Sequence, residues 1–315
     1  MSSGGFGPAV RVSPRGPTRL EMLRAARGVL HAAVAVGAAV GVFLLLGLLG
    51  VYDLPFIFRY LPSGVGPAVT SLVLTTLSFL IGFALALPLA VVRAFPPRGI
   101  GSGRSRLAPP LSSTSAAGAL RLGVRWLIYG LVTGYVQAVR GTPFLVQVFL
   151  VYYGIIFAFP RLSFIGLNVS FWAGLIALTI NTTGYQAEAL RGGFQSVELS
   201  QVEAGRALGM TRFQIFRRVT LPQGIRLVTL PLTNEWISNF KTSAILSYIA
   251  VVELFFWSRT DIAYQLARPV DAFVMIAIFY LVINVTLSRV VTFVEYRRRI
   301  PGLGSPVLEL APRPA

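Results

Sequence analysis

Long stretches without any charged side chain constrain this chain more than any other feature. Residues 28–52, 60–92 and 162–187 are uncharged, and each is long enough to carry a helix of about 20 residues across a bilayer. Backbone amides that cross a membrane must be hydrogen-bonded inside the protein, so such stretches form helices. Charged residues make up only 12% of the chain, against about a quarter in soluble domains. We therefore expect an all-α, polytopic membrane protein.

The uncharged stretches and their flanks predict six transmembrane helices. The expected crossings are 28–52, 68–92, 126–160, 162–187, 227–256 and 272–293. The third contains Pro143, so it is either one crossing with a break or two short helices that meet at the proline; we count it as one. The first crossing is extra to a core at 68–299, and residues 1–27 and 300–315 are expected to be tails, the first of them disordered.

The distribution of arginine predicts the orientation. Nearly all arginines outside the spans lie in the N-terminal tail, in the loops after the second and fourth crossings, and at the C-terminal end. The opposite loops hold only Arg59, Arg161, Arg259 and Arg268. Cytoplasmic loops of membrane proteins are enriched in basic residues. We therefore expect a protein of the bacterial inner membrane with both termini in the cytoplasm. The net charge of +17 then reflects topology, and we expect no nucleic-acid partner.

The chemistry-bearing residue types are scarce. The chain has no cysteine and a single histidine, which excludes a disulfide framework, a thiol nucleophile and most zinc sites. Its only lysine, Lys241, follows Phe240, whereas a phosphate-binding Walker loop needs Gly-Lys-Ser/Thr. We expect neither a metal nor a cofactor, and any use of ATP must come from a partner. A membrane-embedded enzyme is disfavoured, because no His/Cys/Asp cluster is present.

The loop at residues 188–224, which we call the docking loop, has the signals of two short helices. Ser200-x-x-Glu203 is a capping box that would start the first helix, and Gly209 would end it. Thr211-x-x-Gln214 is a second capping box, with Phe213, Phe216 and Val219 on one side of its helix, and Leu221-Pro222 would end that helix. Such a loop could be a solvated connector, a DNA-binding helix-turn-helix or a surface for a partner protein. We favour the partner, because a connector needs neither two caps nor an apolar face.

Several motifs resemble one family. Glu203-Ala204-Gly205-x-x-x-Gly209 with the later Leu221-Pro222 is similar to the EAA loop of ABC importer permeases. The runs 140–147, 185–197 and 221–223 are similar to the permeases for polar amino acids, of the histidine, glutamine and glutamate type. Departures from the family pattern are Gly205, Thr242, Ala244 and the long loop after the second crossing. The residues that the resemblance assigns to ATPase coupling are Glu203, Ala204, Gly205, Gly209, Leu221 and Pro222.

The resemblance implies partners and a function. Its members have a five-span core and are non-catalytic subunits of ATP-driven importers, in which an ABC ATPase dimer hydrolyses the ATP. The chain is expected to work in membrane lipid with that dimer, with a substrate-binding protein and with a second permease subunit, which is either the same or a sister chain. An ion-coupled secondary transporter of small polar solutes is the alternative, although the halves of the chain show no internal repeat. A scaffold protein is a third class.

Polar residues inside the expected crossings are candidates for a substrate pathway. Glu235 and Lys241 are costly at membrane depth, about 3 kcal/mol or more each. They either pack against other helices or line a hydrated path, where they would offer an anion and a cation to a zwitterion. The candidate pathway residues are Gln147, Asn181, Thr182, Gln186, Asn234, Glu235, Ser238, Asn239 and Lys241.

Three further charged residues lie near the predicted break and the docking loop. Arg140 is expected to be structural, either snorkelling or bonding the carbonyl groups freed by Pro143, in preference to contacting substrate. Glu188 and Arg191 are three residues apart at the end of the fourth crossing and are expected to form an ion pair. This pair either holds the helix end beside the docking loop or is an ordinary pair at the membrane interface.

Overall fold

A computed structural model describes residues 34, 41, 45–97, 116–159 and 168–297 of the chain. The chain divides into two units, Met1–Phe56 and Ile57–Ala315. Every regular element in the described residues is helical, which confirms the expected all-α class. The elements are α2 (Leu54–Tyr60), η1 (Leu61–Gly64), α3 (Val65–Ala94), α4 (Ala116–Gly141), α5 (Phe144–Ala158), α6 (Val169–Ser196), α7 (Leu199–Ala207), α8 (Arg212–Ile215), η4 (Phe216–Thr220), α9 (Leu221–Thr242), η5 (Ser243–Ile249), α10 (Leu254–Trp257), η6 (Ser258–Tyr264) and α11 (Pro269–Arg297).

Two helical stretches in the described residues, Leu54–Ala94 and Pro269–Val291, are each long and apolar enough to cross a membrane. Two bent pairs bring the number to four if each pair is one crossing: Gly118–Gly141 with Phe144–Ala158, bent by 112°, and Arg212–Ile249 with Leu254–Tyr264, bent by 55°. The six crossings expected from the sequence therefore stay a prediction. The crossing at 28–52 lies largely outside the described residues, as do both expected tails.

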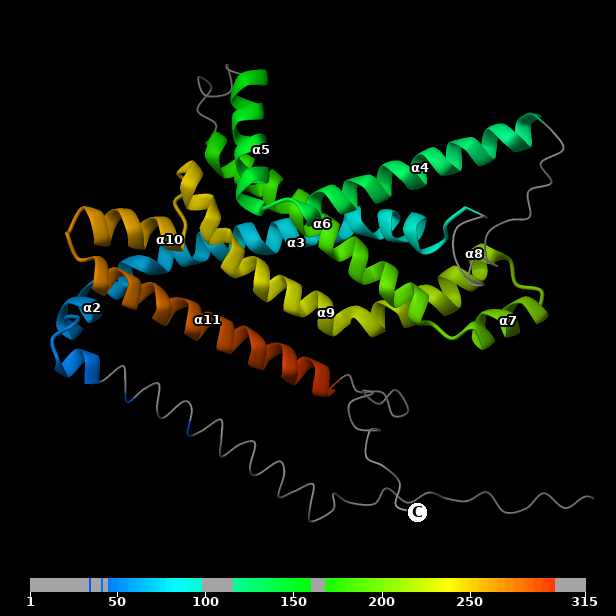
Figure 1. Cartoon of the computed structure of the whole chain (residues 1–315). Coiled ribbons are helices and arrows are strands. Elements are labelled where there is room, and N and C mark those ends of the chain that lie inside the picture. Colours follow the sequence, from blue (N-terminus) through cyan, green and yellow to red (C-terminus); the bar gives the residue numbers. More distant parts are fainter. Residues whose placement is uncertain (1–33, 35–40, 42–44, 98–115, 160–167, 298–315) are drawn as a thin grey trace, which may run out of the picture. The chain divides into compact units, whose positions relative to one another are not determined.

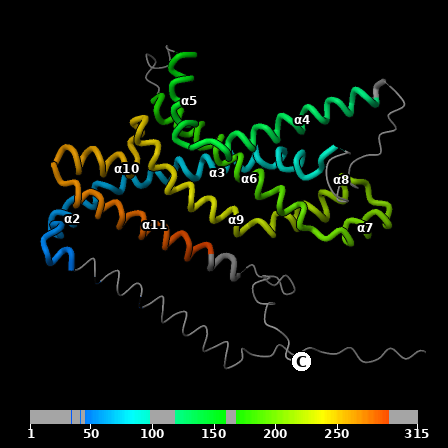
Figure 2. Tube along the Cα trace, viewed as in Figure 1, coloured from blue at the N-terminus to red at the C-terminus, as the bar shows by residue number. Residues whose placement is uncertain are grey.

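Helix α6 is the centre of the second unit. It packs along α3 and along α9, and α7 and α8 follow it at one end of the bundle (Figures 1 and 2). Apolar side chains bury Leu178 in one core cluster and Leu190 in another. Between these two positions α6 carries Asn181, Thr182 and Gln186, which are also buried. Helix α6 can carry these polar side chains because they contact protein groups and not lipid. It is therefore less apolar than a lipid-facing helix.

The predicted break in the third crossing is confirmed at Thr142 and Pro143. The backbone of Pro143 is extended, with φ −61° and ψ 136°, and α5 starts at the next residue. A proline has no amide hydrogen and disfavours helical geometry in the residue before it, so α4 ends there. In Figure 1, α5 consequently runs in a different direction from α4.

The docking loop contains the second predicted cap and the predicted glycine turn. Gly209 has φ +72°, in the left-handed region, and its amide donates to the carbonyl oxygen of Arg206 at 2.9 Å. The side chain of Thr211 accepts from the Gln214 amide at 3.3 Å, and the Gln214 side chain accepts from the Thr211 amide at 2.7 Å. Both halves of this capping box are therefore confirmed.

The first predicted cap of the docking loop is wrong. Helix α7 begins at Leu199, before Ser200, and Glu198 occupies the N-cap position. The Ser200 hydroxyl, already inside the helix, donates to the Glu198 carboxylate at 3.2 Å. An acidic side chain at a helix N-terminus is favourable because of the helix dipole. Ser200 is the second residue of this helix, so it does not occupy the N-cap position that the capping box requires.

The predicted helix end at Leu221-Pro222 is also wrong. The five residues of η4 form a π-helical turn, in which the amide of Leu221 donates to the carbonyl oxygen of Phe216. Helix α9 follows at once, with Pro222 in its first turn, where a missing amide hydrogen is tolerated. The π turn shifts the hydrogen-bond ladder just before the proline, so the helix continues through it.

Candidate functional site

Five of the candidate pathway residues are buried and bond to other protein groups. The side-chain amide of Asn181 donates to Gln147 at 3.0 Å, and that of Gln186 donates to the backbone oxygen of Phe79 at 3.2 Å. Asn239 donates to the hydroxyl of Thr182. These bonds connect α6 with α5, with α3 and with α9. The arrangement is a polar seam inside the helix bundle.

The remaining candidates lie on another side of α9. Asn234, Ser238 and Lys241 are exposed on the single chain, and Glu235 is half-buried. Tyr248 is exposed beyond them, and the guanidinium of Arg259 lies 5.2 Å from the centre of its ring. The structure therefore separates the predicted polar residues into the buried seam and an exposed face on α9. The two groups do not form one site within this chain.

Gln147 serves the break between α4 and α5. Its side-chain nitrogen donates to the carbonyl oxygens of Val139 at 2.7 Å and Thr142 at 3.2 Å, and to the Thr142 hydroxyl at 2.9 Å. In a continuous helix the carbonyl oxygen of Val139 would accept from the amide of residue 143, which a proline lacks, so the Gln147 side chain replaces that missing donor. The sequence suggested that Arg140 bonds the carbonyl groups at the break, whereas in the structure the side chain of Gln147 makes these hydrogen bonds.

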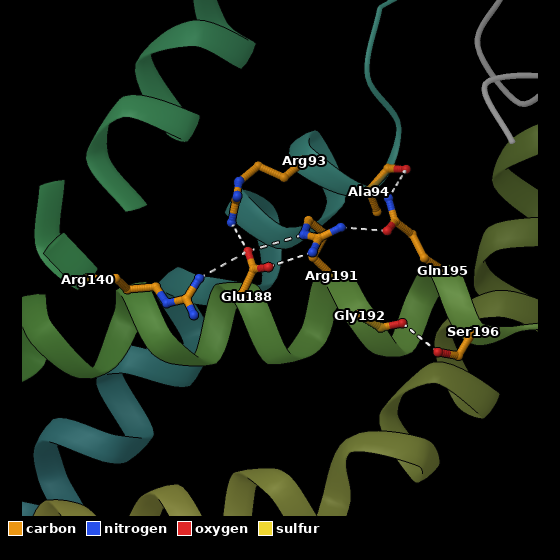
Figure 3. A network of polar contacts seen from close by, with 8 residues as sticks. All are labelled: Arg93, Ala94, Arg140, Glu188, Arg191, Gly192, Gln195 and Ser196. Carbon is orange, nitrogen blue, oxygen red and sulfur yellow. Dashed lines mark hydrogen bonds and ion pairs between the residues drawn. The ribbon is translucent and has the colours of Figure 1, made fainter. Parts of the chain in front are cut away.

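An ion cluster centred on Glu188 connects α3, α4 and α6 (Figure 3). The predicted pair is confirmed: Arg191 donates to the two carboxylate oxygens of Glu188 at 2.5 and 3.1 Å. Arg93, at the end of α3, forms an ion pair with the same carboxylate. Arg140, at the end of α4, lies farther away, with 3.8 Å between its Nη1 and a Glu188 oxygen. Three guanidinium groups thus share one carboxylate.

The same end of α6 is fastened to α3 and α9 next to the docking loop. Gln195 accepts from Arg191 at 2.5 Å and donates to the backbone oxygen of Ala94 at 3.5 Å. Gly193 of α6 lies so close to α9 that an added Cβ would be 2.6 Å from the carbonyl oxygen of Gly224. The ends of these three helices next to the docking loop consequently form one tightly packed base for it.

Three large apolar side chains of the docking loop are exposed, and Leu208 and Phe213 are the most exposed of them. Leu208 is 82% exposed and Phe213 is 68% exposed. Phe213 therefore does not share the environment of Phe216, which packs between Phe95 and Phe194. Ile215 is buried and lies against Gly205, where an added Cβ would be 3.2 Å from Ile215 Cγ1. The loop is internally packed while it presents these apolar side chains outward, as a docking surface would.

Glu253 is a buried acid that the sequence reasoning did not single out. Its carboxylate accepts from the amides of Phe255 at 2.9 Å and Phe256 at 2.7 Å, and from the Ser71 hydroxyl at 3.3 Å. It caps α10 and connects it to α3. The signal was available, since an acid directly before an apolar Leu-Phe-Phe run is a helix-start pattern. Among the described residues no group of His, Cys, Asp and Glu could hold a metal ion.

Comparison with known proteins gives one consistent result. Residues 108–300 match the family described as binding-protein-dependent transport system inner membrane component. The chain is 33% identical over 252 residues to the nopaline transport system permease protein NocM of Agrobacterium fabrum, across 78% of this chain and 91% of that protein. It is also 33% identical over 184 residues to the glutamine transport system permease protein GlnP of Escherichia coli, across 58% of this chain and 82% of that one.

Solved structures show the same relationship. A chain of an amino acid ABC transporter crystallised with histidines is 30% identical, with a TM-score of 0.60, and the match covers 78% of this chain and 99% of that one. A chain of the inward-facing MetNI methionine ABC transporter has the same fold, with a TM-score of 0.52 and 20% identity, across 77% of this chain and 99% of its own length.

Proposed function

This chain belongs to the family of binding-protein-dependent transport system inner membrane components, and from that membership we propose that it is the permease subunit of an ATP-driven importer of polar amino acids. The match over most of the chain to permeases of glutamine and nopaline transport systems carries the proposal. The similar chain of an amino acid ABC transporter, at 30% identity, supports the same substrate class.

The docking loop is the proposed contact with the motor. An ABC ATPase dimer binds this loop, with Leu208 and Phe213 entering an apolar groove of the ATPase. Their exposure supports this contact, since large apolar side chains at the tip of a packed loop gain free energy when a partner covers them. ATP hydrolysis then belongs to the partner, and this chain does no covalent chemistry. The residues that the family resemblance assigns to ATPase coupling lie in the same loop: Glu203, Ala204, Gly205, Gly209, Leu221 and Pro222.

The packed base of the docking loop transmits movement of the loop to the helices that it connects. Because Gly193 and Gly224 bring α6 and α9 into backbone contact, a displacement of the loop moves both helices together. The Glu188 cluster adds the end of α3 to the same body. A rigid inner end that moves as one piece fits alternating access, in which the pathway opens first to one side and then to the other.

The exposed face of α9 is the proposed substrate pathway. Asn234, Ser238 and Lys241 are polar side chains on a helix at membrane depth, where contact with lipid tails is unfavourable. A second permease subunit, the same or a sister chain, covers this face and encloses a hydrated path. The buried polar residues of the seam hold the helices that carry the path. A substrate-binding protein delivers the amino acid to the outer loops.

The proposed arrangement in the inner membrane has six crossings. They are the segment 28–52, α3, the bent pair α4 and α5, α6, α9, and α11, with both termini and the docking loop in the cytoplasm. The arginine distribution supports this orientation. An ion-coupled secondary transporter is not favoured, because the family and the similar proteins are components of binding-protein-dependent or ABC systems.

Reconstitution tests the proposed function. The chain is purified together with its ATPase and its binding protein, and the complex is placed in proteoliposomes. The twenty standard amino acids are tested in labelled form, and we expect that at least one polar amino acid is taken up in a process that requires both ATP and the binding protein. Uptake driven by an ion gradient without ATP would support the secondary transporter instead, and uptake of no amino acid would overturn the substrate class.

A further inference from the structure

Tyr248 is the exposed residue of η5, the 3₁₀ helix that continues α9. In Figure 1, α9 runs from α8 of the docking loop at one end towards α10 at the other, and η5 follows it at the end near α10. All seven residues of η5 are described, and Tyr248 alone among them is exposed, at 55%. With steps of about 100° along α9 and about 120° along a 3₁₀ helix, Tyr248 lies about 40° from Ser238 around the axis. It therefore continues the exposed face of α9 at the end away from the docking loop.

The ring of Tyr248 is held by Arg259 of η6. The guanidinium of Arg259 lies 5.2 Å from the centre of the ring and donates to the carbonyl oxygen of Ser247 at 3.4 Å. The support of this arginine is attached to α11, because the buried hydroxyl of Ser258 donates to the carbonyl oxygen of Ala272 at 2.7 Å. A cation over the face of a ring is attracted to it. The ring is therefore held in a defined direction by a fixed neighbour.

The backbone that follows Tyr248 is attached to α3. Ala250 ends η5 with φ 58° and ψ 32°, in the left-handed region, which a residue with a side chain keeps only where the surrounding structure determines it. Directly after this turn, Glu253 caps α10 and accepts from the Ser71 hydroxyl of α3 at 3.3 Å. The oxygen of the same hydroxyl accepts from the amide of Leu254 at 3.1 Å. Tyr248 is consequently carried by α9 and α3 together.

An exposed tyrosine at the end of a membrane helix can serve in two ways. It can anchor the helix at the lipid interface, where tyrosines are common, or it can contact another protein chain. Tyr248 continues the face of α9 that carries Asn234, Ser238 and Lys241, and these polar side chains are unfavourable against lipid tails. A chain that covers this face also covers the ring. This continuity favours the contact with protein.

We propose that Tyr248 forms the barrier of the substrate pathway at the end away from the docking loop, by packing against the second permease subunit. The inference rests on the proposed function, which places a hydrated path between the exposed face of α9 and that subunit. An aromatic ring packed across such a path makes an apolar constriction, which excludes water and a zwitterion. Because α9 and α3 carry the ring, a displacement of the packed base separates it from the second subunit and opens the path.

Efflux from proteoliposomes tests the barrier. The complete importer is loaded with a labelled amino acid that the wild type takes up, and efflux is followed without ATP and without the binding protein. Tyr248→Ala is expected to raise the rate of efflux at least about tenfold, the change that a barrier lower by about 1.4 kcal/mol produces. Tyr248→Phe, which keeps the ring, stays at the wild-type rate. Tyr264→Ala, at an exposed tyrosine of η6 that does not continue α9, also stays there.

A cross-link identifies what covers the ring. Tyr248 is replaced by the photoreactive amino acid p-benzoylphenylalanine, and the complete importer is irradiated. We expect a covalent product with the second permease subunit in the absence of ATP, identified by mass spectrometry. Trapping the importer with ATP, vanadate and the binding protein should abolish this product, because the ring then lies away from that subunit.

Other results would overturn the proposal. If a folded Tyr248→Ala variant kept the wild-type efflux, the ring would not be the barrier. If that variant did not fold, the cross-link, which keeps a ring at this position, would still decide. A product with lipid only would make Tyr248 an interfacial anchor, and an equal yield in the trapped importer would show that the contact does not open. Absence of any amino-acid uptake by the wild type would instead count against the proposed function itself.

Discussion

The side-chain amide of Gln147 on α5 donates a hydrogen bond of 2.7 Å to the carbonyl oxygen of Val139 on α4, across the break at Pro143. The same side chain accepts from Asn181 of α6. One glutamine therefore satisfies the broken end of α4 and attaches the break to the central helix. Because Gln147 is buried, no water is available to replace its side chain as the hydrogen-bond partner of these groups.

Gln147→Ala is expected to lower the stability of the protein. It leaves the carbonyl of Val139 and the amide of Asn181 buried without their partner, at about 1–3 kcal/mol for each group. Thermal unfolding in detergent measures the effect, with Gln137→Ala as the control, since Gln137 is an exposed glutamine of α4. Equal melting temperatures for the two variants would show that Gln147 does not support the break.

Gly193→Ala and Gly192→Ala form a matched pair on α6. An added Cβ at Gly193 meets the carbonyl oxygen of Gly224 at 2.6 Å, so the helices must separate, at a cost of about 1–3 kcal/mol. An added Cβ at Gly192 meets nothing within 4 Å, and replacing a helical glycine by alanine there stabilises by up to about 1 kcal/mol. Unfolding in detergent should give shifts of opposite sign. Two shifts of the same sign would mean that α6 and α9 are not in backbone contact.

Glu188→Gln is expected to destabilise the end of the bundle next to the docking loop by several kcal/mol, because Arg93 and Arg191 then lack their counter-charge in a partly buried place. Glu198→Gln, at an exposed position of the docking loop, should cost about 1 kcal/mol or less. Hydrogen exchange of the α3 and α6 amides locates the effect. Unchanged protection at the end of α3 in Glu188→Gln would contradict the role of the cluster in holding α3.

Glu253→Ala and Glu253→Gln are expected to differ in degree. Alanine removes both acceptors of the α10 amides and the partner of Ser71, whereas glutamine keeps one acceptor oxygen. The alanine variant should lose about 1–2 kcal/mol more than the glutamine variant, measured by unfolding in detergent. If the two variants were equally stable, the carboxylate would not act as the cap of α10.

Most local patterns in the sequence predicted local structure correctly, and the capping box at Ser200 is an exception. The cap at Thr211, the turn at Gly209 and the break at Pro143 each depend on a few neighbouring residues, and all three are present. The ion pair of Glu188 and Arg191 is also local, at three residues apart. These features are predictable because their physical causes, a capping side chain, a left-handed residue and a missing amide hydrogen, lie within one turn of helix.

Features that depend on distant contacts were not predictable from one sequence. The helix continues through Pro222 because a π turn precedes it, and nothing in the local sequence specifies such a turn. Arg93 lies far from Glu188 in the chain, and only the packing of α3 on α6 brings them together. Likewise, the spacing of polar residues on α9 could not show that Asn239 is buried while Asn234 is exposed. The assignment of the break to Gln147 required the structure as well.

The most direct measurement of the central claim replaces the two most exposed apolar side chains of the docking loop, Leu208 and Phe213, by aspartate. It compares ATP-dependent uptake by this double variant with that of the wild type in proteoliposomes. We predict that the Leu208→Asp and Phe213→Asp double variant unfolds at the wild-type temperature, no longer copurifies with the ATPase and loses uptake by at least about tenfold. Normal ATP-dependent uptake by this folded variant would contradict the claim that the docking loop is where the motor acts on this chain.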